Sequence, residues 1–294
     1  MADGPDELFT LRNNFYLGNF TQCVHEGGSL RVAAEALQTE RDTLVVRSYL
    51  AMGNTESALA EVSMISSDSP AALQAVKLHA ELAAYPEKKD QVLQSLKSLL
   101  GASSNASNPL VQIIAATIYQ STGDHRSALR TMRNFEGGLE AMAFGVQCYL
   151  AMNLVDKAYS LLKKMQSIDD DATLSQLANA WVFLAVGGTK YEESYYIFQE
   201  LIDKYGETVP LLNGIAVALM HQGNYDQASP FLVTALSKNG GNPDTLVNMI
   251  VCAQHLSKPT EVINRYLREL RKHAPQNPWL LRYNAAVESF DRVA

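Results

Sequence analysis

The sequence predicts an all-α fold, an α-solenoid of about eight helical hairpins with a capping helix at its C-terminal end. Two observations support this prediction. A short pattern, Gly-x-aromatic-x-x-small, returns along the chain at intervals close to 34 residues. Between its copies, apolar residues recur with the spacing of one helix face rather than with the alternation of a strand. A fixed period of this length is typical of stacked helical repeats.

The copies of the pattern set the repeat boundaries. The clear copies are GNFTQC ending at Cys23, GNTESA at Ala58, GDHRSA at Ala128 and GNYDQA at Ala228, and weaker ones end at Ala158, Ser194 and Val262. Successive copies end 35, 70, 30, 36, 34 and 34 residues apart. Because 70 is twice 35, we expect a degenerate copy near Leu93. This period and signature are those of the tetratricopeptide repeat, two antiparallel helices joined by a tight turn.

The best copy, residues 209–242, gives each pattern residue a physical role. Gly223 ends the first helix, where a left-handed backbone or a close approach is needed. Tyr225 fills the wedge at the turn. Ala228 faces Ala216, and two small residues let the helices come close together.

The chain is expected to form one solenoid over residues 1–294. The hairpins run from about residue 5 to about residue 275, and an amphipathic helix over roughly 277–292 caps the stack. GASSNASNP at 101–109 is the longest polar loop, and FEGG at 135–138 is a second break. Neither is long enough to predict separate domains.

Charge and composition exclude several classes of function. The net charge is -7 and no basic tail is present, so we expect no nucleic-acid partner. The basic stripe Arg265, Arg268 and Lys272 is interrupted by Glu261 and Glu269 and is interpreted as a solvated face. The acidic N-terminus lacks the apolar core of a signal peptide, and no run of about 18 apolar residues occurs. We therefore expect a cytoplasmic protein without direct membrane insertion.

No catalytic, metal or cofactor site is predicted. Phosphate-binding glycine loops, nucleophile elbows and HExxH are absent from the sequence. The three cysteines lie far apart, and His221 and His255 occupy the same place in consecutive repeats, which favours packing roles. The acidic run at 169–171 precedes a helical stretch and is interpreted as a helix cap. We expect neither an enzyme nor a cofactor.

The concave face of such a solenoid is the candidate partner-binding surface. In three consecutive repeats the first-helix residues that point into it are Gln176, Asn179, Phe183 and Val186; Pro210, Asn213, Val217 and Met220; and Asp244, Val247, Val251 and Gln254. This mixture of apolar side chains and amides suits an extended or hairpin ligand with a few apolar anchors. The alternative is that Phe183, Val217 and Val251 only pack against neighbouring helices. No lysine or arginine occupies the second or fifth first-helix position, which disfavours a carboxylate clamp.

Several long strings resemble the family of coatomer epsilon subunits. They are DELFTLRNNFYLGNFTQCV (6–24), DDDATLSQLANAWVFLAVGGTKYEESYYIFQEL (169–201), LLNGIAVALMHQGNYDQA (211–228), NPDTLVNMIVCAQHLSKPTEVINRYLREL (242–270) and FDRV (290–293). The likeness spans nearly the whole chain and is strongest from 165 to 270.

The resemblance implies a non-enzymatic structural subunit of the COPI vesicle coat, acting in Golgi-to-ER retrograde and intra-Golgi transport. It implies binding to, and stabilisation of, the coatomer alpha subunit through that subunit's C-terminal domain, and contact with other coatomer subunits through it. The implied location is the cytoplasm, peripheral on Golgi and COPI-coated vesicle membranes. The alternative is a free-standing tetratricopeptide-repeat adaptor or co-chaperone that binds peptide motifs.

Overall fold

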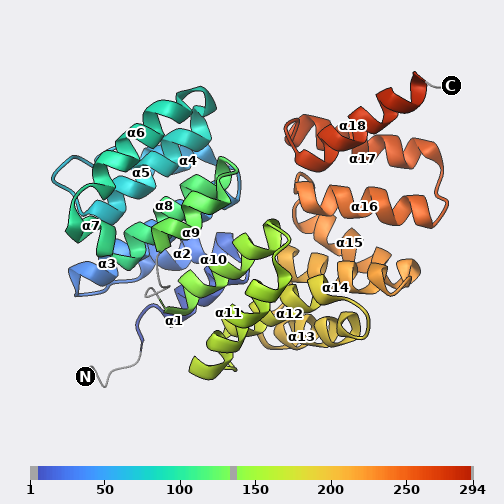
Figure 1. Cartoon of the computed structure of the whole chain (residues 1–294), viewed down its shortest axis with the longest axis horizontal. Coiled ribbons are helices and arrows are strands. Elements are labelled where there is room, and N and C mark those ends of the chain that lie inside the picture. The colour runs from blue at the N-terminus through green and yellow to red at the C-terminus, as the bar shows by residue number, and fades with distance from the viewer. Residues whose placement is uncertain (1–5, 133–137, 293–294) are drawn as a thin grey trace. The chain divides into compact units, whose positions relative to one another are not determined.

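A computed structural model describes residues 6–132 and 138–292, except for the side chain of residue 291. The chain divides into two compact units, Met1–Ala185 and Val186–Ala294. Helices account for all regular structure in the described ranges (Figure 1). Each unit is described by itself below.

The first unit contains helices α1 to α12. Their bounds are α1 Phe9–Tyr16, α2 Phe20–Ser29, α3 Glu35–Ala51, α4 Thr55–Glu61, α5 Ala71–Ala84, the 3-10 turn η1 Pro86–Lys88, α6 Lys89–Leu100, α7 Ser103–Ser107, α8 Pro109–Ser121, α9 His125–Met132, α10 Gly138–Ala151, α11 Val155–Ile168 and α12 Thr173–Val186. The second unit contains α13 Lys190–Tyr205, α14 Val209–His221, α15 Tyr225–Lys238, α16 Pro243–His255, α17 Thr260–His273 and α18 Pro278–Asp291.

The helix order confirms the predicted all-α solenoid fold. Eight successive pairs run from α1/α2 to α16/α17, with the boundary between the units falling inside the sixth, and α18 follows where the capping helix is expected. The degenerate copy is the pair α5/α6, whose connection contains η1. Next to the predicted position, Val92 is buried, with 3% of its surface exposed, and Leu93 is half-buried.

In the clear copies of the pattern, the glycine after the first helix has a left-handed conformation. Gly223 has φ +82°, as the pattern predicts. Asn153 and Ser257 take the same place in two weaker copies, with φ of 57° and 50°. The left-handed turn geometry is therefore present even where the sequence has no glycine. These two side chains carry a backbone strain that glycine avoids.

Small residues occupy the centre of the helix pairs. Ala216 and Ala228 are both fully buried, on the packed helices α14 and α15. At Gly214 an added Cβ would lie 2.5 Å from the ring of Phe198 in α13, so only glycine fits there. Packing at this density makes the helix spacing sensitive to single methyl groups.

The histidines in equivalent places are packing residues. His221 stacks on Tyr191 of the preceding repeat, with ring centroids 4.7 Å apart, and His255 stacks on Tyr225 at 4.0 Å. The aromatic of one turn thus supports the first helix of the next repeat. The predicted wedge residue Tyr225 therefore packs against the following repeat.

The stretch predicted as the longest loop contains a short helix. Within 101–109 the chain forms α7, and the side chain of Asn105 donates a hydrogen bond to the Leu99 carbonyl oxygen at 3.0 Å. Asn108 then caps α8 by accepting hydrogen bonds from the N–H groups of Leu110 and Val111. Local side-chain hydrogen bonds stabilise this short helix, although its sequence has no apolar periodicity. Of the second predicted break, residues 135–137 lie outside the described residues.

Replacing Ser257 by glycine is expected to stabilise the chain by about 0.5 kcal/mol. Relief of the left-handed strain exceeds the entropy that glycine adds to the unfolded chain. The reverse change, Gly223→Ala, should destabilise by about 1 kcal/mol. Urea unfolding of both variants measures these shifts, and a lower midpoint for Ser257→Gly would contradict the prediction.

Candidate partner-binding surface

An amide network joins the two central first helices of the second unit. Asn213 on α14 donates to the Val209 carbonyl oxygen at 2.9 Å and to Thr245 Oγ1 on α16 at 2.8 Å. Its Oδ1 accepts from Asn248 Nδ2 at 2.9 Å. Asn213 is only 8% exposed. The polar atoms of this candidate contact are therefore engaged within the chain, where they fix α14 against α16.

Four apolar candidates lie beside this network. We call Val217 and Met220 on α14 and Val247 and Val251 on α16 the apolar row. All four are half-buried, so their neighbours cover them in part and a part of each faces solvent. Asp244 and Gln254, at the two ends of the α16 set, are exposed, and so is Pro210.

The α12 candidates have mixed surroundings. Gln176 donates a hydrogen bond to the Asp170 carbonyl oxygen at 2.8 Å and so holds the preceding loop. Asn179 Oδ1 is buried without a hydrogen-bond partner. Phe183 is half-buried, and Val186, at the end of the helix, is 50% exposed.

The acidic run forms the turn between α11 and α12. Asp169, the C-terminal cap residue of α11, accepts hydrogen bonds at Oδ1 from the backbone N–H groups of Asp171 and Ala172, both at 3.1 Å. Both donors precede Thr173, the first residue of α12, so the capping of that helix by this run stays a prediction.

A buried charge network in the first unit was missed by the sequence analysis. Arg47 on α3 forms an ion pair with Glu140 on α10 at 2.6 Å, and the two side chains are 10% and 18% exposed. The hydroxyl of Tyr16 on α1 donates to the other Glu140 oxygen at 3.1 Å. The Arg47 guanidinium also lies 4.4 Å from the ring centroid of Phe15. One carboxylate thus holds α1 and α3 against α10.

Burial shifts the titration of two groups around this network. Burial, followed by the nearby Glu140 carboxylate, raises the pKa of Tyr16 well above its ordinary value. Burial and the positive charge of Arg47 lower the pKa of His79 on α5 to about 4. His79 Nδ1 and Arg47 Nη1 are buried without hydrogen-bond partners. The imidazole is therefore neutral at physiological pH.

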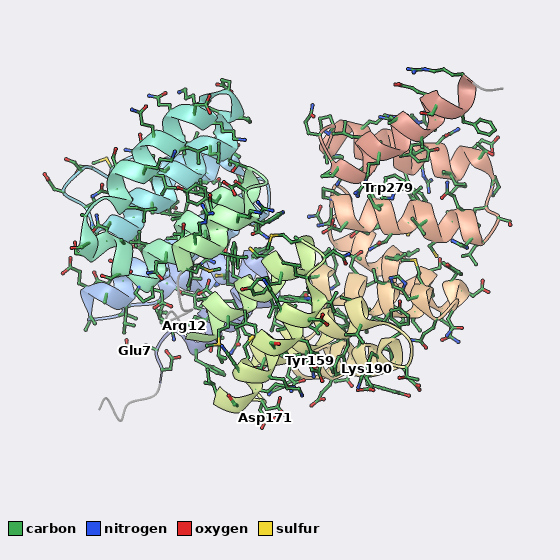
Figure 2. The ribbon with its side chains drawn as sticks, in the orientation of Figure 1. Glu7, Arg12, Tyr159, Asp171, Lys190 and Trp279 are labelled. Atoms are coloured by element: carbon green, nitrogen blue, oxygen red, sulfur yellow. The ribbon has the colours of Figure 1, made fainter. Side chains whose placement is uncertain are left out.

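Carboxylates of the same chain also compensate the charge of a second arginine in the first unit. Arg12 (Figure 2) donates to both Glu40 oxygens at 2.6 and 2.9 Å and to Asp6 at 2.6 Å. The hydrogen bond to Glu40 is the main reason why the pKa of Arg12 is raised. Arg12 and Arg47 share the ninth first-helix position of their repeats, 11 residues before Cys23 and Ala58, so reading that position would have revealed them. Internal carboxylates already pair with both guanidiniums, which leaves neither as a simple clamp for an external carboxylate.

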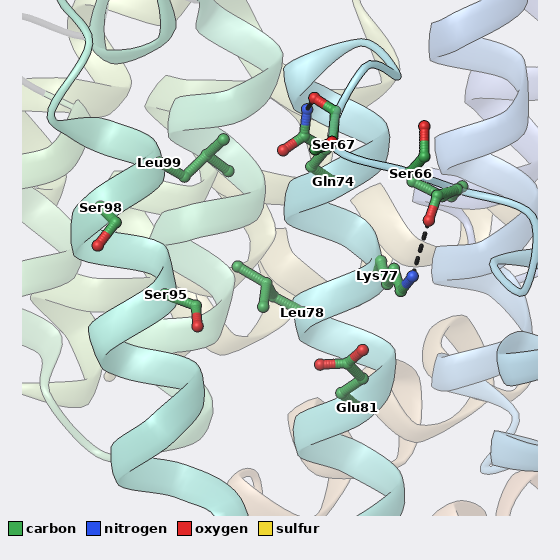
Figure 3. Close-up of a pocket in the computed structure, with 10 residues that line it drawn as sticks. Ser66, Ser67, Gln74, Lys77, Leu78, Glu81, Ser95, Ser98 and Leu99 are labelled. Atoms are coloured by element: carbon green, nitrogen blue, oxygen red, sulfur yellow. Dashed lines mark hydrogen bonds between the residues drawn. The ribbon is translucent and has the colours of Figure 1, made fainter.

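A pocket of about 450 Å³ lies between α5 and α6 and is also lined by the connection between α4 and α5 (Figure 3). Lys77 Nζ donates to the Ile65 carbonyl oxygen at 2.7 Å, and Gln74 donates to the carbonyl oxygens of Ser67 and Ser69. These hydrogen bonds fix the connection between α4 and α5 against α5. The pocket lining holds serines but no histidine or cysteine, and the serines are not hydrogen-bonded to a general base.

The remaining chemical candidates are packing residues. All three cysteines are buried, and burial raises the pKa of Cys148 to about 11. A raised pKa makes a thiol a poor nucleophile. Within the described ranges, no group of three or more His, Cys, Asp or Glu side chains could hold a metal ion. None of the described helices is both long and apolar enough to cross a bilayer.

Solved structures define the class to which this fold belongs. A tetratricopeptide repeat protein from Parabacteroides merdae matches with a TM-score of 0.60 and 16% identity, over 83% of this chain and 96% of that one. The Cut9–Hcn1 hetero-tetramer structure of the APC/C matches with a TM-score of 0.65 and 12% identity, over 94% of this chain and 54% of that one. The fold is that of a tetratricopeptide-type helical-repeat protein.

Sequence comparisons then give the family. The model of the coatomer epsilon subunit matches residues 4–294. Coatomer subunit epsilon-1 of Oryza sativa subsp. japonica is 41% identical, over 98% of this chain and 97% of that protein. Epsilon-1 of Arabidopsis thaliana is 38% identical, over 99% and 97%, and the Caenorhabditis elegans epsilon subunit 35%, over 98% and 98%. The chain belongs to the coatomer epsilon subunit family. It is a structural component of a vesicle-transport coat and associates with other coatomer subunits.

Removing the charge of Glu140 is expected to destabilise the first unit strongly. Glu140→Gln leaves the buried Arg47 guanidinium uncompensated, which costs about 3 kcal/mol. The control is Glu193→Gln, which breaks an exposed pair with Lys190 of similar length, 2.7 Å, and should cost less than about 1 kcal/mol. Urea unfolding compares the two, and equal losses would contradict a buried network.

Acidification is expected to destabilise the chain through His79. Its pKa is near 4 when folded, below the unfolded value of 6.5, so the unfolded state binds the proton first as the pH falls. Stability from this group is complete above pH 6.5 and decreases down to about pH 4. The free energy of unfolding falls by at most about 1.4 kcal/mol per pH unit through this group. Thermal unfolding from pH 7 to 4 should show a shallower loss for His79→Leu than for the wild type, and parallel curves would contradict this assignment.

Proposed function

We propose that this chain binds the C-terminal domain of the coatomer alpha subunit and stabilises that subunit within the coat. In this role it acts in Golgi-to-ER retrograde and intra-Golgi transport, in the cytoplasm and peripheral on Golgi and COPI-vesicle membranes. Other coat subunits contact it through alpha. Membership of the epsilon family supports an interaction role inside the coat.

The apolar row is the observation on which the binding site rests. Its four side chains lie on the packed helices α14 and α16, and all four are half-buried. Half-buried apolar side chains gain further burial when a partner covers them. The proposed contacts on α14 and α16 are the row itself and the exposed Asp244 and Gln254 at its ends. On α12, taken separately, Gln176, Asn179, Phe183 and Val186 stay predicted contacts.

Asn213 has a supporting role in this proposal. Its hydrogen bonds to Thr245 and Asn248 fix α14 against α16, so the apolar row is held in place before a partner arrives. A surface ordered in advance loses less conformational entropy on binding. We therefore expect Asn213 to position the row, with its neighbours making the direct contacts.

The first unit offers less to a ligand on the corresponding helices. There Arg12 and Arg47 are paired with Glu40 and Glu140, and the Tyr16 hydroxyl is bonded to the same Glu140. A ligand would have to break these pairs to use them, at a cost of several kcal/mol for a buried pair. The second unit is thus the better supported binding region.

Changing Val217 and Val251 together to glutamate is expected to weaken alpha binding at least about tenfold. Two charges would be buried against an apolar partner surface without compensation. Calorimetric titration of the full chain with the isolated alpha C-terminal domain from the same organism measures this, and the wild type should bind one to one.

The matched control is Val233→Glu on α15, which places the same charge at a residue that is 53% exposed and off the row. Its affinity should equal that of the wild type, with helicity checked by circular dichroism for both variants. If the double variant binds as well as the control, the interface lies elsewhere. If the folded wild-type chain does not bind at all, the alternative of a free-standing peptide-binding adaptor takes precedence.

A further inference from the structure

Helix α18 begins like the first helix of another hairpin. Asn277 accepts hydrogen bonds from the N–H groups of Trp279 and Leu280, and Pro278 stands at the first helical position. Asn242 and Pro243 open α16 in the same way. The helices α14 and α16 are each packed against a second helix, α15 and α17. The described residues end at 292, directly after α18, and contain no such second helix for it.

One face of α18 is open where the equivalent faces are covered. Counted from the first helical residue, this face carries the fourth and eighth residues, Leu281 and Ala285, which we call the open seat. Leu281 is 48% exposed and Ala285 is also exposed. The neighbouring Leu280 is 1% exposed, so the helix is firmly packed on an adjoining face. The equivalents of the seat are 0 or 1% exposed: Leu212 and Ala216 on α14, and Leu246 and Ile250 on α16.

The seat keeps the residue types used for helix packing. Leu281 and Ala285 repeat the leucine and alanine of α14, Leu212 and Ala216. A large apolar side chain followed one turn later by a small one lets a second helix approach closely and bury the first. A terminal repeat that faces only water is better served by a polar outer face. The seat therefore has the composition of a helix-packing surface.

Three arginines lie on α17 and α18 around the seat, and Glu288 follows Ala285 one turn later on the same face. Arg271 of α17 donates a hydrogen bond to Asn284 of α18 at 3.3 Å, and Arg268 lies one turn earlier on α17. Arg282 follows Leu281 directly. Among the described ion pairs, none involves these three arginines. Unpaired guanidiniums beside an apolar seat favour acidic side chains on whatever covers it.

We propose that an acidic amphipathic helix of another coat subunit packs on the open seat and completes a ninth hairpin. Its apolar stripe would cover Leu281, with a small residue against Ala285, and its carboxylates would pair with Arg268, Arg271 and Arg282. A protein helix fits better than an anionic membrane, because one leucine and one alanine bury too little area for interfacial insertion. This inference does not depend on the alpha contact proposed above, which uses other residues.

Thiol labelling in the assembled coat tests the proposal. The three natural cysteines are buried, so Ala285→Cys and its neighbour Ala286→Cys each add a single accessible thiol at an exposed position. In the free chain both should react with N-ethylmaleimide at similar rates. In coat complex purified with the variant chain, Ala285→Cys should react roughly tenfold more slowly, because a covering helix removes the thiol from solvent. Ala286→Cys should change little.

Charge reversal and cross-linking identify the occupant. Adding Arg271→Glu and Arg282→Glu to Ala285→Cys should restore fast labelling in the complex. A benzophenone attached at residue 285 should cross-link to an acidic helical segment of another subunit. Equal protection of both thiols, protection of neither, cross-linking to a second copy of this chain, or protection by phosphatidylserine vesicles alone would each overturn the proposal.

Discussion

The close approach of two helices at a small residue is the constraint on which the structure depends. The residue that ends each clear copy of the repeat pattern is completely buried, whether it is Cys23, Ala58, Ala128 or Ala228. At this point a larger side chain would force the helices apart, and every later repeat would inherit the error. Stability in such a stack is the sum of neighbouring contacts. The spacing within one pair therefore decides where the next pair can bind.

Local rules made much of the fold predictable. The pattern GNYDQA located the turn at Gly223 because a left-handed residue, an aromatic wedge and a small anchor all serve the same turn. The same spacing placed the degenerate copy near Leu93, and the buried residue there is its neighbour Val92. The spacing did not predict α7, because side-chain hydrogen bonds of Asn105 and its neighbours stabilise that helix rather than apolar packing.

The candidate surface was less predictable, since repeat spacing gives the direction of a side chain but not its partners. Asn213 was predicted to face a ligand, yet its amide is engaged by Thr245 and Asn248 of the next repeat. Arg47 and Glu140 are 93 residues apart in sequence, and no local pattern links them. The two units consequently differ in character. Internal ion pairs engage the arginines at the ninth first-helix position of the first unit, whereas the apolar row of the second is suited to a partner.

The contact of Glu140 with α1 and α3 also concerns the order in which the chain can fold. Repeat proteins generally fold from neighbour to neighbour, so a growing chain can add each hairpin as it leaves the ribosome. Here Tyr16 and Arg47 can form their contacts with Glu140 only after that residue is made, 124 and 93 positions later in the chain. Long loops of this kind slow the final closure. The N-terminal hairpins should therefore remain loosely held during synthesis until α10 emerges, which makes the first unit a single cooperative folding step.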